Sequence, residues 1–187
     1  MLDAIAIGGS AGALEPLFEI LKKLPPSVAA PVVVVMHVLP NHPSLIPELL
    51  QHACPDRTVR EPEDKEPLAP RTIYVAPPNY HLLVEHGRTF ALSVDDPVNF
   101  SRPSIDVLFE SAADAFGARF AGVLLSGSNA DGAAGLAAIA RQGGATIVQA
   151  DAAYPTMPEA GLHRVPNARA LTPAEIRPLL AALESAP

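Results

Sequence analysis

Five consecutive apolar residues, Val-Val-Val-Val-Met at positions 32–36, constrain the fold of this chain more than any other segment. β-Branched side chains favour extended backbone, and a strand with no polar face must be covered on both sides. Strands of this kind are typical of parallel sheets, which carry helices on both faces. We therefore expect an α/β protein in which residues 32–36 form a buried parallel strand.

Segments with strand and helix patterns alternate along most of the chain. Further strands are expected at residues 4–9, 72–76, 120–125 and 145–149, the last of these being the final clear strand. Helices are expected from Leu14 onward and at residues 44–53, 105–116, 131–142 and 173–184. The alternation predicts an open, mostly parallel, doubly wound sheet of Rossmann-like type with helices on both faces, built as a single domain over residues 1–187.

Local signals support several of these boundaries. Ser104 has the character of an N-cap and Gly117 of a helix stop, while Thr172 and Glu175 have the spacing of a capping box. Two short apolar segments, 81–85 and 90–94, flank the turn residues His-Gly-Arg and predict one β-hairpin.

Composition excludes several classes of protein. The formal charge is −7 with only three lysines, and no basic cluster occurs along the sequence, which argues against a nucleic-acid surface. No apolar run approaches the roughly 18 residues of a membrane span, and the N-terminus lacks a secretory signal, so we expect a soluble, cytoplasmic protein without membrane insertion. The single cysteine, Cys54, has no partner for an internal disulfide and is expected to be a buried apolar residue.

Three residues suited to acyl transfer follow expected strands. Ser10 lies in the turn after residues 4–9, His37 ends the strand at 32–36, and Asp131 follows the strand at 120–125. Acyl transfer needs a hydroxyl nucleophile, an imidazole that moves its proton, and a carboxylate that orients the imidazole. Because parallel strands end at one edge of a sheet, the three side chains are expected to converge there.

Each of the three residues also has a plain structural interpretation. Ser10, placed by the pattern at a helix start, would cap that helix; His37 would be a packed strand residue; Asp131 would be a turn or cap residue. The segment Gly-Gly-Ser-Ala-Gly-Ala at 8–13 matches the nucleophile elbow of α/β-hydrolases only in part, since the order serine, histidine, acid differs from that superfamily. It also lacks the glycine pattern of a dinucleotide site, and the histidines show no metal-ligand spacing.

Several long motifs resemble one known family. The segments IGGSAGA, VVVVMHVLP, YVAPPNYHLLV, SRPSIDVLFESAA and GVLLSGSNADGAAGLAAI occur in the order and spacing of the catalytic domains of CheB-type protein-glutamate methylesterases, and GGATIVQADAAYPTMPEAGL follows them. The resemblance extends from about Ala4 to Leu183. Its several separate motifs make it far more specific than one glycine pattern.

The resemblance implies an activity and a site. Family members hydrolyse γ-glutamyl methyl esters on the cytoplasmic helices of chemoreceptors, releasing methanol, and deamidate particular receptor glutamines without a metal or organic cofactor. Ser10 matches the nucleophile, His37 the base and Asp131 the orienting acid. Arg102, with Pro103 and Ser104, matches a segment bordering the substrate cleft, where it would attract a glutamate-rich receptor or simply be an exposed arginine.

The chain also departs from the family pattern. Ala11 replaces a threonine common after the nucleophile, and Ser128 replaces a methionine common before the acid. Backbone N–H groups near Ala11 and Ser128 would still bind the oxyanion, because they do not depend on the side chains. The first strand begins almost at Met1, so we expect a stand-alone catalytic domain without a phosphoryl-accepting receiver domain, unless the chain is a fragment.

Two other functions remain open at this point. A non-catalytic adaptor could keep the same fold and bind a signalling partner, although such a module has no need of all three catalytic groups. A serine hydrolase acting on a small ester or amide would use the same groups on a different substrate.

Overall fold

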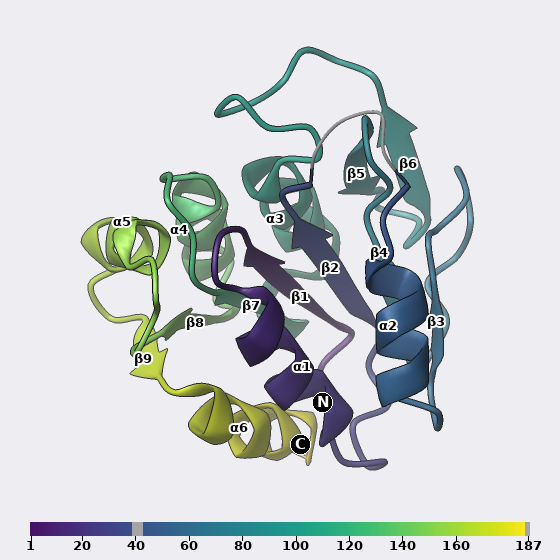
Figure 1. The fold of residues 1–187 in the computed structure, drawn as a ribbon, viewed down its shortest axis with the longest axis horizontal. Coiled ribbons are helices and arrows are strands. Elements are labelled where there is room, and N and C mark those ends of the chain that lie inside the picture. The colour runs from purple at the N-terminus through teal and green to yellow at the C-terminus, as the bar shows by residue number, and fades with distance from the viewer. Residues whose placement is uncertain (39–42, 186–187) are drawn as a thin grey trace.

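A seven-stranded parallel sheet forms the centre of the protein in a computed structural model that describes residues 1–38 and 43–185. The strands lie in the order β3-β4-β2-β1-β7-β8-β9 (Figure 1). Their bounds are β1 Ala4–Gly9, β2 Val32–Met36, β3 Thr58–Arg60, β4 Thr72–Val75, β7 Phe120–Leu124, β8 Ala145–Gln149 and β9 Arg169–Leu171. The chain order reverses between β1 and β7, which in open α/β sheets is where functional sites form.

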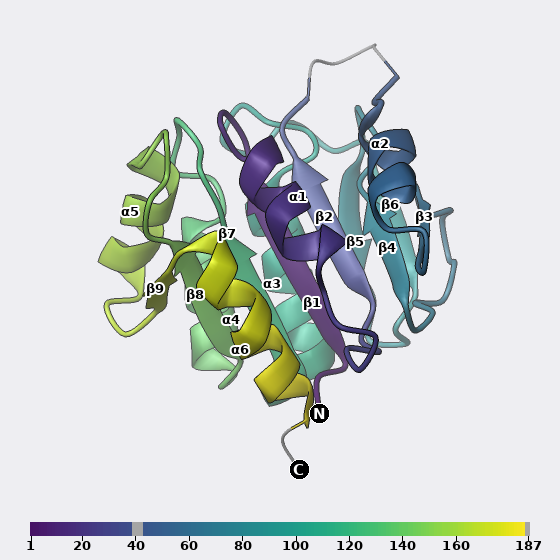
Figure 2. The same ribbon diagram turned by 60° about the horizontal axis from the view of Figure 1, so that its bottom comes forward.

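Helices cover both faces of this sheet (Figure 2). One face packs against α1 (Leu14–Lys22), α2 (Ile46–Ala53) and α6 (Pro173–Ser185). The other packs against α3 (Ile105–Phe116), α4 (Ala133–Arg141), α5 (Thr156–Arg164) and the antiparallel hairpin of β5 (His81–Val84) and β6 (Phe90–Ser93). A short 3-10 turn, η1 (Gly117–Arg119), links α3 to β7. The predicted fold class, including the hairpin, is therefore confirmed.

The position of strand β2 between two helical layers explains why its sequence has no polar face. Val32, Val34 and Met36 belong to the core on one side of the sheet, whereas Val33 and Val35 belong to the core on the other. Alternate side chains of a strand point to opposite faces, so a central strand between two helical layers must be apolar at every position.

Most predicted boundaries agree with the structure to within two residues. Gly117 ends α3 with a φ of 58°, and both the amide and the hydroxyl of Thr172 donate to the Glu175 carboxylate at the start of α6, at 2.9 and 2.8 Å. The prediction placing Ser10 at a helix start was wrong. Helix α1 begins at Leu14, its N-cap is Ala13, and the intervening turn leaves Ser10 on the loop.

Three elements were not foreseen. Strands β3 and β9 are short edge strands with exposed residues and therefore lack an apolar run. Residues 145–149 are consequently not the last strand. Helix α5 contains Pro158 and Gly161, which disfavour helix in isolation, but Pro158 lies in the first turn, where its missing N–H costs little. No helix in the described part of the chain has the length and apolar character needed to cross a membrane.

Candidate active site

The ends of β1 and β2 bring Ser10 and His37 to neighbouring positions. Gly9 is paired with Met36 in the parallel register, and the His37 N–H donates to the Gly9 carbonyl at 3.1 Å. The Ser10 N–H donates across the other side of β1 to the Ser126 carbonyl at 2.9 Å. Ser10 is therefore held between the loops that follow β2 and β7, as predicted for the carboxyl edge of the sheet.

His37 forms a direct hydrogen bond with Asp131. The distance between His37 Nε2 and Asp131 Oδ2 is 2.8 Å, and the exposed fractions of the two side chains are 13% and 0%. Gly132, the next residue, has a φ of 89°, and a Cβ there would lie 2.5 Å from Leu124 Cδ1. This glycine permits the tight turn between β7 and α4 that directs Asp131 inward.

The Asp131 carboxylate also accepts hydrogen bonds from the N-terminus of α3 and from the loop before it. The Ile105 N–H donates to Oδ2 at 2.7 Å, and the Asp106 N–H donates to Oδ1 at 3.2 Å. The Ser104 hydroxyl donates to Oδ1 at 2.8 Å, and Asn99 Nδ2 donates to the same oxygen at 3.0 Å. Asp131 thus caps α3, a helix distant in sequence, where the helix dipole stabilises negative charge.

These contacts decide the ionisation of Asp131. Burial alone would raise its pKa, but hydrogen bonds from His37, Asn99, Ile105 and Ser104 outweigh burial and lower the pKa below its ordinary value. Asp131 is therefore an ionised carboxylate at neutral pH and accepts the bond from His37. His37 Nε2 then carries a proton, which leaves Nδ1 as the basic nitrogen.

The basic nitrogen lies near the hydroxyl group of Ser101. His37 Nδ1 lies 3.5 Å from Ser101 Oγ, at the limit of a hydrogen bond. Within the described residues, no hydrogen bond joins the Ser10 hydroxyl to the His37 ring, although their backbones are adjacent. Such catalytic hydrogen bonds are commonly long in the free enzyme and tighten when substrate binds.

The residues expected to bind the oxyanion lie on two loops that hydrogen bonds of the Ser126 hydroxyl hold in place. The Ser126 hydroxyl donates to the Ala11 carbonyl at 2.8 Å and accepts from the Tyr154 N–H at 2.9 Å. Among the residues described, the backbone N–H groups of Ala11 and Ser128 have no hydrogen-bond partner. Both amides therefore remain free to donate a hydrogen bond, as an oxyanion site requires.

A cavity of about 410 Å³ adjoins His37 and is lined by Phe100, Ser101 and Arg102 among others. Arg102 lies at this cavity, and its Nη1 donates to the carbonyls of Val94 and Asp95 at 2.8 and 3.0 Å. These bonds hold the guanidinium on the loop without neutralising its charge. Phe100 is fully exposed beside it.

Sequence reasoning missed three polar residues of this site. Asn99 Nδ2 donates to Asp106 Oδ2 at 2.8 Å as well as to Asp131, and Asp106 Oδ1 accepts from the Gly135 N–H at 2.7 Å. Burial raises the pKa of Asp106. The third residue is Ser101, beside His37. The sequence offers only a weak signal for Asn99, namely its residue type. Its φ is 51°, a backbone conformation that asparagine tolerates better than most residues.

Comparison with known proteins identifies the family. The sequence profile of the CheB methylesterase family matches residues 5–180. The chain belongs to the CheB methylesterase family. The crystal structure of the Thermotoga maritima CheB methylesterase catalytic domain superposes with a TM-score of 0.91 at 28% identity, covering 98% of this chain and 99% of that one.

Relatives with known names agree with this assignment. A Leptospira interrogans protein, provisionally named protein-glutamate methylesterase/protein-glutamine glutaminase, is 44% identical over 147 residues, which are 79% of this chain and 76% of the relative. The Salmonella typhimurium protein-glutamate methylesterase/protein-glutamine glutaminase is 39% identical over 151 residues, which are 79% of this chain and 43% of the relative. The matched region therefore covers less than half the length of the Salmonella protein.

Proposed function

We propose that this protein hydrolyses the methyl esters of glutamate side chains on chemoreceptors, with Ser10 as nucleophile, His37 as base and Asp131 as orienting acid. The observation that carries the proposal is the 2.8 Å bond between His37 and an ionised, buried Asp131, at the sheet edge where Ser10 adjoins His37. Family membership supports the ester substrate. Chemoreceptor helices carrying these esters lie in the cytoplasm, so we place the reaction there.

The first half-reaction acylates Ser10. Substrate binding brings the Ser10 hydroxyl to His37 Nδ1, which takes its proton while the oxygen attacks the ester carbonyl. Asp131 stabilises the imidazolium through Nε2–H, and the amides of Ala11 and Ser128 donate to the oxyanion. The tetrahedral intermediate collapses, the bond to the methoxy group breaks, and methanol leaves with the proton from His37.

The second half-reaction returns the enzyme to its starting state. His37 removes a proton from water, the hydroxide attacks the acyl-enzyme, and Ser10 leaves after regaining a proton from His37. The product is a glutamate side chain. With a glutamine substrate, the same steps release ammonia in place of methanol, which is deamidation.

Arg102 provides the proposed contact with the receptor surface. Its guanidinium is fixed beside the cavity by two carbonyl oxygens, so a positive charge is presented there at little entropic cost. Receptor methylation segments contain glutamates that such a charge attracts, in a protein otherwise carrying a net charge of −7.

The decisive experiment measures methanol release from a methylated receptor fragment. Ser10→Ala should lower turnover by about 10⁶-fold, the loss found for removing the nucleophile of a serine protease. Ser185→Ala, at an exposed position in the last turn of α6, is a matched control that should keep full activity. Methanol release near the wild-type rate by Ser10→Ala would refute the assignment.

A fluorophosphonate probe then identifies the reacting hydroxyl. The adduct is expected on Ser10 and should be absent from Ser10→Ala. An adduct on Ser101, whose oxygen lies 3.5 Å from His37 Nδ1, would transfer the nucleophilic role to that residue. A wild-type protein that takes no label and releases no methanol would be an adaptor.

A further inference from the structure

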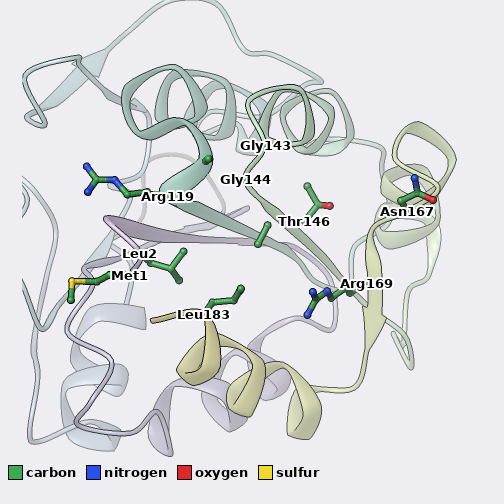
Figure 3. Close-up of a pocket in the computed structure, with 11 residues that line it drawn as sticks. Met1, Leu2, Arg119, Gly143, Gly144, Thr146, Asn167, Arg169 and Leu183 are labelled. Atoms are coloured by element: carbon green, nitrogen blue, oxygen red, sulfur yellow. The ribbon is translucent and has the colours of Figure 1, made fainter. Parts of the chain in front are cut away.

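A second cavity lies at the end of the sheet opposite the candidate active site. It measures about 610 Å³ and is lined by the connections that enter β7, β8 and β9, with Arg119 and Arg169 on opposite sides (Figure 3). An adjoining cavity of about 500 Å³ carries Arg141 and Arg164. The two cavities share Gly143, Gly144, Thr146 and Asn167, so they form one continuous surface, here called the arginine surface.

The topology explains how four arginines meet there. Arg119 ends the turn between α3 and β7, and Arg141 ends α4 before β8. Arg164 ends α5, and Arg169 begins β9. In a parallel sheet all helix-to-strand connections lie at the amino ends of the strands, so arginines separated by whole elements in sequence become neighbours.

The charge of this surface is unbalanced. Among the residues that the structure describes, no Asp or Glu lines either cavity, although the whole chain has a net charge of −7. Asp3 lies close to Arg119, with 2.7 Å between Oδ2 and Nη2, but the same carboxylate oxygen also pairs with Arg88 at 2.8 Å. Within the described residues, Arg141, Arg164 and Arg169 form no ion pair, and all three are exposed.

Helix ends explain only part of this arrangement. Arg141 and Arg164 lie in the last turns of α4 and α5, where a cation interacts favourably with the helix dipole. Arg169 lies in a strand and gains nothing of this kind, and Arg119 ends a 3-10 turn of only three residues. A structural requirement common to all four is therefore absent, whereas a shared anionic ligand accounts for all of them.

From these observations we infer that the arginine surface binds an acidic polypeptide segment of a partner protein, rich in Asp and Glu. The guanidinium groups are distributed around two adjoining cavities, which suits an extended chain of carboxylates better than one small anion. Arginine pairs with carboxylates through two parallel hydrogen bonds, which gives such a surface directional contacts. Within the described part of the chain, neither cavity has an aromatic residue for base stacking, so the surface suits a peptide better than a single-stranded nucleic acid.

The position of this surface gives it a distinct role. His37 and Asp131 follow the carboxyl ends of β2 and β7, whereas the arginine surface lies at the amino ends of β7, β8 and β9. A partner bound there leaves the candidate active site open. Such a contact would tether the protein to an acidic partner and raise the effective concentration of any second site on it.

The test uses the full chain and a dye-labelled poly-glutamate peptide, with binding followed by fluorescence anisotropy. Arg164→Glu combined with Arg169→Glu places one reversed charge in each cavity and should weaken binding roughly tenfold or more, because several modest exposed ion pairs are lost together. Lys22→Glu combined with Lys23→Glu is the control, since it makes the same change in net charge at the exposed end of α1. The control should bind like the wild type, and high salt should weaken wild-type binding.

Several results would overturn the inference. Equal weakening by the two double variants would show that binding follows net charge and not this surface. Equal binding of a poly-glutamine peptide, or failure of the wild type to bind poly-glutamate at low salt, would also reject it. Tighter binding of inorganic phosphate or of an oligonucleotide than of the peptide would assign the surface to another ligand. None of these measurements depends on esterase activity, so they are independent of the proposed reaction.

Discussion

Asn99 connects two buried carboxylates at the candidate active site. Its amide nitrogen donates to Asp106 at 2.8 Å and to Asp131 at 3.0 Å. One neutral side chain therefore holds together two acids whose negative charges repel. Its hydrogen bonds help to lower the pKa of Asp131 and oppose part of the rise that burial causes in the pKa of Asp106. We regard Asn99 as a positioning residue, because it acts on the reaction through Asp131 and not by touching substrate.

Removing this amide should affect both catalysis and stability. Asn99→Ala is expected to cost about 1.5–3 kcal/mol in the free energy of unfolding at neutral pH, the range for a hydrogen bond to a charged group. It should lower kcat with little change in KM, because a less firmly held Asp131 orients His37 poorly. Asn167→Ala, which removes an exposed amide in the turn before β9 that has no hydrogen bond within the described residues, is the matched control and should change neither quantity.

The pH dependence distinguishes this role from a general packing role. Asp131 has a folded pKa below its unfolded value, so its contribution to stability is present above the unfolded value and is lost as pH falls through the folded pKa. Part of that lowering comes from Asn99. The stability difference between wild type and Asn99→Ala should therefore shrink in acid, as measured by urea denaturation across a pH series. A difference that stays constant in acid would contradict the prediction.

Helices α3 and α4 meet closely because Gly135 has no side chain. A Cβ at Gly135 would lie 2.4 Å from Phe109 Cβ and 3.2 Å from the Asp106 backbone. The same residue donates its N–H to the Asp106 carboxylate. The contact between the two helices thus fixes the N-terminus of α3, whose amides hold Asp131.

Gly135→Ala should separate the two helices and disturb the site. We expect a loss of about 1–3 kcal/mol in unfolding free energy, typical of overpacking in a core, together with a lower rate of methanol release. Gly87→Ala is a suitable control, since its new Cβ would meet only Thr89 Oγ1 at 3.9 Å. Unchanged stability and activity in Gly135→Ala would show that α3 and α4 move apart without cost.

The sequence predicted those helices and strands whose conformation follows from the local pattern of apolar residues. Residues 4–9, 32–36 and 145–149 are apolar enough to identify strands, and the structure has those bounds. Strand β9 and helix α5 owe their conformation to neighbours: β9 pairs with β8, and Gly161 of α5 packs near Leu124 and Val148. The pairing of His37 with Asp131 followed from strand order, but the Asn99 contacts depend on a loop conformation that no periodicity encodes.

The arginine surface shows the same limit for the whole molecule. The sequence has no basic cluster, and on that basis it argues against a nucleic-acid surface. The fold brings together Arg119, Arg141, Arg164 and Arg169 because each lies at or beside a helix-to-strand connection. The order of charged residues in the sequence shows that no basic tract exists. It cannot predict a basic surface that forms only when arginines distant in sequence meet in the fold.

Cys54 provides a measure of the stability of the whole molecule. It is buried, and it belongs to the apolar core that runs along one face of the sheet from α6 through α1 to α2. Burial, with a smaller effect of Asp56, raises the pKa of its thiol, which lowers the fraction of reactive thiolate. Because the surrounding core is continuous, we expect Cys54 to become accessible only when the protein unfolds globally.

Labelling with an aromatic disulfide reagent tests this expectation. The native protein should react slowly, and the free energy of opening obtained from the labelling rate should equal the free energy of unfolding measured by urea denaturation. Ala174→Cys in a Cys54→Ser background places the thiol on the exposed surface of α6 and should react at once. An opening free energy for Cys54 well below the global value would mean that α2 detaches from the sheet as a separate unit, and the core on this face would then consist of two cooperative parts.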